Sequence, residues 1–194
     1  MELILASASP RRKALLDQIG VQCSVKPVDI CEDVRDAELA VDYVERLAIE
    51  KAQVCFALTD GSKAVLGSDT TVVLDGRIMG KPTDQNEAIE TLQRLSGNTH
   101  QVLTAVAVVT SEQTRSVVVT TNVRFREISL AECEAYWRSG EPQDKAGSYG
   151  IQGFGAVFVE EIKGSYSAVV GLPLTETAEM LVQAGIRIWH SLEN

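Results

Sequence analysis

The sequence predicts a single domain in which β-strands and α-helices alternate. The chain has 194 residues, a length typical of one domain that can have two lobes, and 45% of the residues are hydrophobic, enough for a sizeable core. A short apolar run, Leu3–Ala6, is predicted as a buried strand that leads directly into a helix starting after Ser9 and ending at Gly20. Two long runs, His100–Thr110 and Val117–Arg126, are predicted as strands that could pair antiparallel and extend the sheet.

Several helices are expected between the strands. One starts after Asp84, with Glu87 at the spacing of a capping box. Another starts after Ser129, with Glu132 at the same spacing. The longest is predicted over residues 38–58, with these side chains toward the core: Leu39, Tyr43, Leu47, Val54 and Leu58.

The stretch Val65–Leu74 places a carboxylate between apolar runs. Both runs are short and β-branched, and they are predicted as two buried strands with Gly67-Ser68-Asp69-Thr70 between them. A buried carboxylate is costly without partners. Asp69 therefore either caps a turn through its side chain or takes part in chemistry. Asp75-Gly76, which follows, is typical of a tight hairpin turn.

The charge balance excludes several kinds of partner. The chain carries 18 basic and 27 acidic residues, for a formal net charge of −9. A surface that acidic disfavours binding to nucleic-acid polymers and to anionic membranes. Several cations nevertheless stand beside Gly, Ser or Pro, which favours a small anionic ligand, although each alone could be an ordinary solvated side chain: Arg11, Arg12, Lys81, Lys145 and Lys163.

The cysteines and histidines indicate the compartment and argue against zinc. The four cysteines form no CxxC pair and are interpreted as free, mostly buried thiols in a reducing cytosol. With two histidines in the chain, a zinc site built from His and Cys is not expected. The N-terminus has no basic segment before its short apolar run, and no run is long enough to span a membrane. A cytoplasmic location is therefore expected.

Three polar loops carry candidate ligand-binding groups. Residues 7–12 lie at a predicted helix N-terminus, where backbone N–H groups attract phosphate, although a well-capped surface helix is the alternative. In Gly80-Lys81-Pro82 the neighbouring residues fix the backbone around one lysine. The Gly-rich loop Asp144–Gly153 carries Gln152, whose amide both donates and accepts hydrogen bonds and so suits the edge of a nucleobase.

An acidic cluster and an isolated lysine are further candidates. The cluster Asp29-Ile30-Cys31-Glu32-Asp33 follows a predicted strand within residues 21–28. Its carboxylates could hold a hard cation such as Mg²⁺, or the cluster could be an acidic turn. Lys51 lies among small and apolar residues of the 38–58 helix, where it could be solvated or reach a phosphate.

In combination and in this order, the motifs resemble those of the Maf family, the septum-formation-inhibitor-like nucleotide pyrophosphatases. The resemblance implies one Maf-like domain over residues 1–194 with an α/β fold. In this Maf/ITPase-like fold a mixed, strongly curved sheet is flanked by helices, and two lobes surround a nucleotide cleft. The matching segments span nearly the whole chain: Leu3–Arg12, Gly67–Thr70, Gly80–Pro82, Leu95–His100, Asp144–Gly153, Gly164–Tyr166 and Gly171–Pro173.

The resemblance implies hydrolysis of a nucleoside triphosphate to the monophosphate and pyrophosphate, with a divalent metal (Mg²⁺ or Mn²⁺). Asp69 would accept the proton of the water that attacks the α-phosphorus. Glu32 would bind the metal together with Asp69. The remaining matches are the phosphate-facing lysines, Lys51 and Lys81, and the N-terminal phosphate loop with Ser7, Ser9, Arg11 and Arg12. Such a set provides the positioning and charge neutralisation that phosphoryl transfer requires.

Three positions resemble the branch of the family that acts on dTTP and UTP: Arg11, Thr70 and Gln152. The branch that acts on methylated GTP has Trp in place of Arg11 and Glu near Gln152. A Gln amide can pair with the O4/N3–H edge of thymine or uracil, whereas a carboxylate suits guanine. The expected substrates are dTTP and UTP, with modified pyrimidine nucleotides as a further option, and Lys145 belongs to the same expected substrate site.

The resemblance leaves other points open. It implies a homodimer, and it offers an alternative function, a nucleotide-binding regulator of cell division in which hydrolysis is incidental. A purely structural module is disfavoured by the cations in Gly-rich loops. Ser68 and Ser148 stand where Ala is commoner in the family. Cys31 replaces a common second acidic residue beside Glu32, so Asp29 or Asp33 could complete the metal site.

Overall fold

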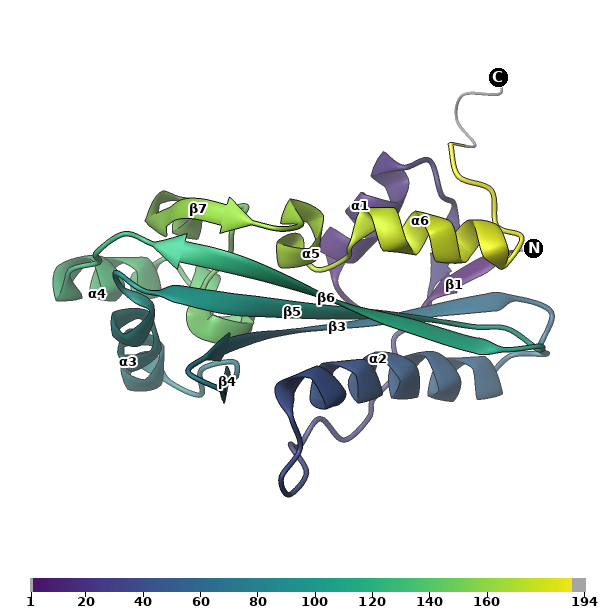
Figure 1. The fold of residues 1–194 in the computed structure, drawn as a ribbon, viewed down its shortest axis with the longest axis horizontal. Helices are drawn as coiled ribbons and strands as arrows, with labels where there is room; N and C mark the ends of the chain where they lie inside the picture. Colours follow the sequence, from purple (N-terminus) through teal and green to yellow (C-terminus); the bar gives the residue numbers. More distant parts are fainter. Residues whose placement is uncertain (1, 190–194) are drawn as a thin grey trace. The chain divides into compact units, whose positions relative to one another are not determined.

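Within residues 2–189, which the computed structural model describes, seven strands form one mixed sheet (Figure 1). The strands are β1 (Leu3–Leu5), β2 (Cys23–Val25), β3 (Ala64–Leu74), β4 (Arg77–Met79), β5 (Thr99–Val109), β6 (Thr114–Phe125) and β7 (Val159–Lys163). Their order is β2-β1-β3-β5-β6-β7, with β4 paired to β3. β1 runs parallel to both β2 and β3. β4 runs antiparallel to β3, and β7 runs antiparallel to β6.

Helices flank this sheet, so the predicted α/β class with a mixed sheet is confirmed. The α-helices are α1 (Pro10–Gln18), α2 (Ala40–Ala57), α3 (Gln85–Leu95), α4 (Leu130–Arg138), α5 (Tyr166–Val170) and α6 (Leu174–Gln183). Short 3₁₀ helices are η1 (Glu141–Asp144), η2 (Ala146–Ser148) and η3 (Phe154–Phe158). No helix among residues 2–189 is both long and apolar enough to cross a membrane.

The described chain divides into two compact units. The first unit comprises residues 2–69, 104–119 and 171–189, and the second comprises residues 70–103 and 120–170. In the first unit, α2 lies on one face of the strands, and α1 and α6 lie on the other (Figure 1). Large leucines fill its core, among them Leu5, Leu16, Leu47, Leu66, Leu172 and Leu181.

The predicted core face of α2 was largely wrong. Leu47 is buried as expected, but Leu39 and Leu58 are 65% and 61% exposed, and Val54 is also exposed. The buried face instead carries mostly small side chains: Val44, Leu47, Ala48, Ala52 and Cys55. Small side chains line this face because α2 approaches β3 very closely.

The closest approach is at Gly67 of β3. A Cβ atom on Gly67 would lie 2.3 Å from the carbonyl oxygen of Ala48 and 2.8 Å from the backbone nitrogen of Ala52. The two strands predicted within Val65–Leu74 are one continuous strand, so Asp69 does not cap a turn. The hairpin at Asp75-Gly76 is confirmed, since Leu74 pairs with Arg77 and both turn residues have positive φ.

The second unit has an aromatic core. Phe125 lies edge-on to His100 and Tyr149, with ring centroids 4.8 and 4.7 Å away, and Phe158 packs beside them. The helix starts expected at Asp84 and Ser129 are confirmed. At Ser129 the capping box with Glu132 is complete, because each side chain accepts the other residue's backbone N–H.

At Asp84 the capping box is only half formed. The Asp84 carboxylate accepts the N–H of Glu87, but the Glu87 carboxylate accepts the N–H and hydroxyl of Thr83 instead of the N–H of Asp84. The four cysteines are free, as predicted; Cys55 and Cys133 are buried, whereas Cys23 is partly exposed and Cys31 exposed. The expectation that they are mostly buried therefore holds for two of them.

Candidate active site

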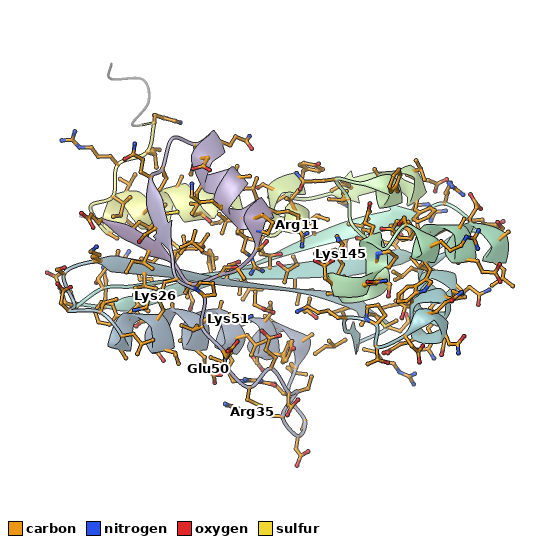
Figure 2. All side chains as sticks on the ribbon, turned by 180° about the vertical axis from the view of Figure 1, so that it is seen from behind. Arg11, Lys26, Arg35, Glu50, Lys51 and Lys145 are labelled. Atoms are coloured by element: carbon orange, nitrogen blue, oxygen red, sulfur yellow. The ribbon has the colours of Figure 1, made fainter. Side chains whose placement is uncertain are left out.

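The two carboxylates expected to act together share one lysine. The Lys51 ammonium lies 2.6 Å from Glu32 Oε1 and 2.7 Å from Asp69 Oδ1, all within the first unit. Figure 2 labels Lys51 on α2. The Lys51 and Asp69 side chains are each 12% exposed, whereas that of Glu32 is 43% exposed. Lys51 is therefore not a solvated lysine, and the charge of Asp69 is paired.

The alternation of side chains along β3 explains this meeting. Residues two apart in a strand face the same side of a sheet, so Gly67 and Asp69 both face α2. Ala48, Lys51 and Ala52 share one face of α2, because residues three and four apart are neighbours on a helix. The close approach of α2 at Gly67 thus brings the Lys51 side chain to the carboxylate one step further along the strand.

The loop that carries Glu32 is held by two side chains of α2. The Tyr43 hydroxyl donates to the backbone carbonyl of Glu32 at 3.0 Å, and Arg46 Nη2 donates to that of Asp33 at 3.0 Å. Arg46 also pairs with Glu38 at 2.6 Å, and this guanidinium lowers the pKa of Glu38 to about 2. Burial, and then the negative charges of Asp69 and Glu32, raise the pKa of Tyr43 to about 12. The hydroxyl therefore keeps its proton and remains a donor.

A second ion pair ties the same loop to α2. Arg35 contacts Glu50 at 2.9 Å, and both are labelled in Figure 2. Tyr43 and Arg46 are functional candidates that the sequence does not indicate, because hydrophobic periodicity predicts Tyr43 as a core residue and Arg46 as an ordinary surface charge. The one available clue was the polar cluster at residues 29–38 opposite a helix rich in charge.

In the N-terminal loop, Ser7 organises its neighbours. Its Oγ accepts the backbone N–H of Ser9 at 3.2 Å and an N–H of Arg12 Nη1 at 3.1 Å. Arg12 Nε donates to the carbonyl of Gly171 at 2.9 Å, and Ser68 Oγ donates to the same oxygen at 3.1 Å. Burial lowers the pKa of Arg12, and the negative charges of Asp69 and Glu32 oppose that shift.

The predicted capping role of Ser9 was wrong in detail. α1 begins at Pro10 as expected, but the Ser9 side chain makes no capping hydrogen bond. Arg11 is partly exposed, and its guanidinium makes no hydrogen bond or ion pair with other side chains or backbone groups of residues 2–189. The loop therefore presents backbone N–H groups together with Arg11 at the start of α1.

The remaining candidates belong to the second unit, where two lysine loops are joined. The backbone N–H of Gly147 donates to the carbonyl of Gly80 at 3.1 Å, which connects the Lys81 loop to the Lys145 loop. Lys81 is exposed, whereas Lys145 (Figure 2) donates to the carbonyl of Glu141 at 2.8 Å and pairs with Asp144 at 2.6 Å.

Gln152 and Thr70 belong to the same unit. Gln152 is exposed in a turn, and its amide has no hydrogen-bond partner among residues 2–189. Thr70 follows Asp69 directly in β3 and is partly exposed. Glu32, Lys51, Asp69 and the loop of residues 7–12 are thus brought together in the first unit, and Lys81, Lys145, Thr70 and Gln152 belong to the second.

The two carboxylates fit a hard divalent cation in part. Carboxylate oxygens are the donors that Mg²⁺ prefers, and Mg²⁺ sites often use one or two carboxylates completed by substrate phosphates. Glu32 and Asp69 already converge on one cation, the Lys51 ammonium. Within the described residues no cluster of three or more His, Cys, Asp or Glu is arranged to hold a metal.

Comparison with known proteins places the chain in a family. The fold and these groups define an α/β protein with paired carboxylates and cation-rich loops. A family model described as Maf-like protein matches residues 2–184. The chain belongs to the Maf family, and the resemblance seen in the sequence is confirmed.

Curated relatives are similar over nearly their whole length. The chain is 56% identical over 188 residues to the dTTP/UTP pyrophosphatase of Colwellia psychrerythraea, covering 95% of this chain and 89% of the relative. It is 58% identical over 177 residues to the dTTP/UTP pyrophosphatase of Pseudoalteromonas translucida, covering 91% and 94%. A solved structure of a nucleoside-triphosphatase from Mycobacterium abscessus is 19% identical to the chain, with a TM-score of 0.44, and the match covers 95% of each chain. This similarity is too low to support a conclusion about function.

Proposed function

We propose that the chain is a nucleoside triphosphate pyrophosphatase that hydrolyses dTTP and UTP to the monophosphate and pyrophosphate. The names of relatives at 56% and 58% identity support the reaction and the substrates. The structural observation that supports it best is the pairing of Asp69 and Glu32 through Lys51. A carboxylate in a largely buried strand, held by a cation, can orient water at a defined place.

In this proposal Asp69 is the proton acceptor. Its carboxylate takes a proton from the water that attacks the α-phosphorus, and pyrophosphate leaves with the electrons of the broken P–O bond. Lys51, fixed on α2, neutralises negative charge beside Asp69. Lys81 is the second phosphate-facing lysine, exposed on its Gly-Pro loop.

Glu32 and Asp69 are the proposed ligands of Mg²⁺ or Mn²⁺. Such a cation would neutralise charge on the phosphate oxygens. The two oxygens that now contact the Lys51 ammonium are the donors that a cation would take, so ammonium and cation compete for them. This competition is supported by the short distances of 2.6 and 2.7 Å.

The N-terminal loop is the proposed anion-binding element. Ser7 fixes Ser9 and Arg12 by hydrogen bonds, so its role is to shape the loop. Arg11 and the N–H groups at the start of α1 are then the groups that meet phosphate. Thr70, Lys145 and Gln152 are the proposed determinants of the nucleotide, with the Gln152 amide pairing with the O4/N3–H edge of the pyrimidine.

The test is pyrophosphate release from a panel of nucleoside triphosphates with Mg²⁺ or Mn²⁺. Wild type is compared with Asp69→Asn and with the matched control Asp75→Asn, which makes the same change in the exposed hairpin turn. Wild type and control should release pyrophosphate from dTTP and UTP, and Asp69→Asn should be slower by about 10²–10⁴-fold, the usual contribution of a general base.

Other outcomes would contradict parts of the proposal. Near-normal turnover by Asp69→Asn would contradict the assignment of Asp69 as the proton acceptor. Release from methylated GTP instead of dTTP and UTP would overturn the roles of Arg11, Thr70 and Gln152. Release from no nucleotide would overturn the enzymatic function and favour the regulatory alternative.

Two further expectations belong to the proposal. A cytoplasmic location is supported by four free cysteines, because disulfides are rare in that compartment. A homodimer, implied by the family resemblance, is tested by light scattering of the purified protein, in which a mass of one chain would contradict it.

A further inference from the structure

The carboxylate of Glu141, at the start of η1, lies where three hydrogen-bond donors meet. The Tyr136 hydroxyl lies 2.7 Å from Oε1, the N–H of Gly155 donates to the same oxygen at 3.1 Å, and the N–H of Phe154 donates to Oε2 at 2.8 Å. Burial alone would raise the pKa of Glu141, but these hydrogen bonds, that from Tyr136 first, hold the pKa below its ordinary value. Glu141 is therefore a charged acceptor at neutral pH.

Tyr136 connects the Glu141 carboxylate to Gly150, on the other side of the turn that carries Gln152. Its Oη donates to Glu141 and accepts the backbone N–H of Gly150 at 3.0 Å. Burial, and then the hydrogen bond to Glu141, raise the pKa of Tyr136, so the hydroxyl keeps the proton it donates. The Glu141–Tyr136 pair thus holds Gly150 on one side of Gln152, and Phe154 and Gly155 on the other.

The glycines of this segment leave room for the pair. A Cβ on Gly153 would lie 2.1 Å from Glu141 Oε2, and one on Gly155 would lie 2.6 Å from Tyr136 Oη. A Cβ on Gly150 would lie 3.0 Å from Glu141 Oε1. None of the three has the positive φ that otherwise requires glycine. Their common property is the close approach of the turn to Glu141 and Tyr136.

Glu141 also holds the Lys145 ammonium, the cation of the same loop. Its backbone carbonyl accepts a hydrogen bond from Lys145 Nζ at 2.8 Å. One residue therefore holds both Lys145 and the turn that carries Gln152. The Gln152 amide itself has no partner among residues 2–189, so its position is set by the backbone on either side.

We propose that Glu141 is a positioning residue that sets nucleotide preference by holding the Gln152 turn. This inference rests on the proposed function, in which Gln152 recognises the pyrimidine. Without the Glu141 carboxylate, the N–H groups of Phe154 and Gly155 lose their acceptor and the turn loses its fixed shape. Gln152 then no longer distinguishes the O4/N3–H edge of thymine from the amino-bearing edge of cytosine. The proton acceptor, Asp69, belongs to the first unit and is not part of this network.

The test compares Glu141→Gln with the matched control Glu161→Gln. The Gln variant keeps the size of the side chain, but its NH₂ group places a donor against the N–H of Phe154 or Gly155. Glu161 is an exposed glutamate of β7 in the same unit. Calorimetry measures the Kd of non-hydrolysable α,β-methylene analogues of dTTP and dCTP with Mg²⁺, and steady-state kinetics measures kcat and KM for dTTP and dCTP.

Wild type and Glu161→Gln should prefer the dTTP analogue, and Glu141→Gln should lose that preference by about tenfold, equivalent to about 1.4 kcal/mol. KM for dTTP should rise by a similar factor, while kcat at saturating dTTP stays within about twofold. Tyr136→Phe, which removes only the hydroxyl, should change preference in the same direction and serves if Glu141→Gln does not fold.

The outcomes separate this inference from the proposed function. An unchanged preference in folded Glu141→Gln and Tyr136→Phe would overturn the inference, whatever the activity. An equal loss of kcat for both nucleotides with unchanged preference would also overturn it, because that pattern marks a general structural role. Selective analogue binding by wild type without any pyrophosphate release would refute the proposed hydrolysis, while loss of that selectivity in Glu141→Gln would still support the positioning role.

Discussion

The ammonium of Lys51 lies 2.7 Å from Asp69 Oδ1, which joins the middle of α2 to the middle of β3. Both side chains are nearly buried, and Glu32 contacts the same ammonium from the loop before α2. Charge pairing in such a place affects stability as well as chemistry, because a buried charge without a partner is costly.

Replacing Lys51 by Met should destabilise the metal-free protein by about 2 kcal/mol, because Asp69 and Glu32 then lose the ammonium that pairs with both of them, and their negative charges repel each other. Mn²⁺ should raise the melting temperature of Lys51→Met more than that of wild type, since the metal no longer competes with the ammonium. The measurement is a thermal melt with and without Mn²⁺. Lys13→Met, which removes an exposed ion pair with Asp17, is the control and should change stability by less than about 1 kcal/mol. Equal Mn²⁺ shifts in wild type and Lys51→Met would exclude the competition.

Replacing Gly67 by Ala should destabilise the fold by about 3 kcal/mol, the upper range for overpacking. The added Cβ would lie 2.3 Å from the backbone carbonyl of Ala48, which cannot rotate away. Urea unfolding measures the effect. Gly80→Ala is the matched control, because a Cβ there meets nothing within 4 Å, and it should change the free energy of unfolding by less than about 1 kcal/mol. Equal stabilities of the two variants would refute the close packing of α2 on β3.

Replacing Tyr43 by Phe should weaken metal binding with little effect on nucleotide binding. The change removes the hydrogen bond, 3.0 Å long, that holds the backbone of Glu32. The Mn²⁺ concentration for half-maximal activity should rise by about tenfold, as for other groups that orient a metal ligand. KM for dTTP at saturating Mn²⁺ should stay constant. Tyr166→Phe, at an exposed tyrosine, is the control, and a metal requirement that is the same in both variants would contradict this role.

The buried His100 should make stability depend on pH. Burial lowers the pKa of His100 from 6.5 to about 4, and its Nε2 lies 2.8 Å from the Tyr149 hydroxyl. Between these two pH values the unfolded chain binds one more proton than the native chain, so stability falls as the pH is lowered through that window. The loss from His100 should be about 2 kcal/mol at pH 5 relative to pH 7.

His100→Gln should remove this slope while it keeps a partner for Tyr149. The slope of the free energy of unfolding with pH is measured by urea unfolding at a series of pH values. Protonation of Glu38 and Glu132, whose pKa values their arginine partners hold at about 2, lowers stability as the pH falls below about 5, so the histidine slope is measured between pH 7 and about pH 5. A wild-type slope that persists in His100→Gln would assign the effect to another group.

Local rules predicted several elements correctly from the sequence. The Ser129 capping box and the Asp75-Gly76 hairpin each depend on residues close in the chain, and both are present. The family motifs likewise indicated Asp69, Glu32 and Lys51 as one group, and the first unit brings them together. The capping box and the hairpin could be predicted because the residues that form each of them are neighbours in the chain. The group of charged residues could be predicted because family motifs contain them.

The failures involve contacts that local rules do not contain. The buried face of α2 is lined by Ala48 and Ala52, because Gly67 of β3 allows the helix to approach, while the larger Leu39 and Leu58 lie near its exposed ends. A prediction from hydrophobic periodicity gives most weight to large apolar side chains, and it therefore assigned the wrong face of α2 to the core. The hydrogen bonds of Glu141 were equally hard to foresee, since two of its three donors lie 13 and 14 residues further along the chain.

The most direct test of the proposed chemistry is hydrolysis of dTTP in water enriched in ¹⁸O, with the products analysed by mass spectrometry. Attack of water on the α-phosphorus, with Asp69 as the proton acceptor, predicts one ¹⁸O atom in dTMP and none in pyrophosphate. The rate of labelling should fall in Asp69→Asn and stay unchanged in Asp75→Asn. Label in pyrophosphate would show attack on the β-phosphorus and would contradict the proposed mechanism.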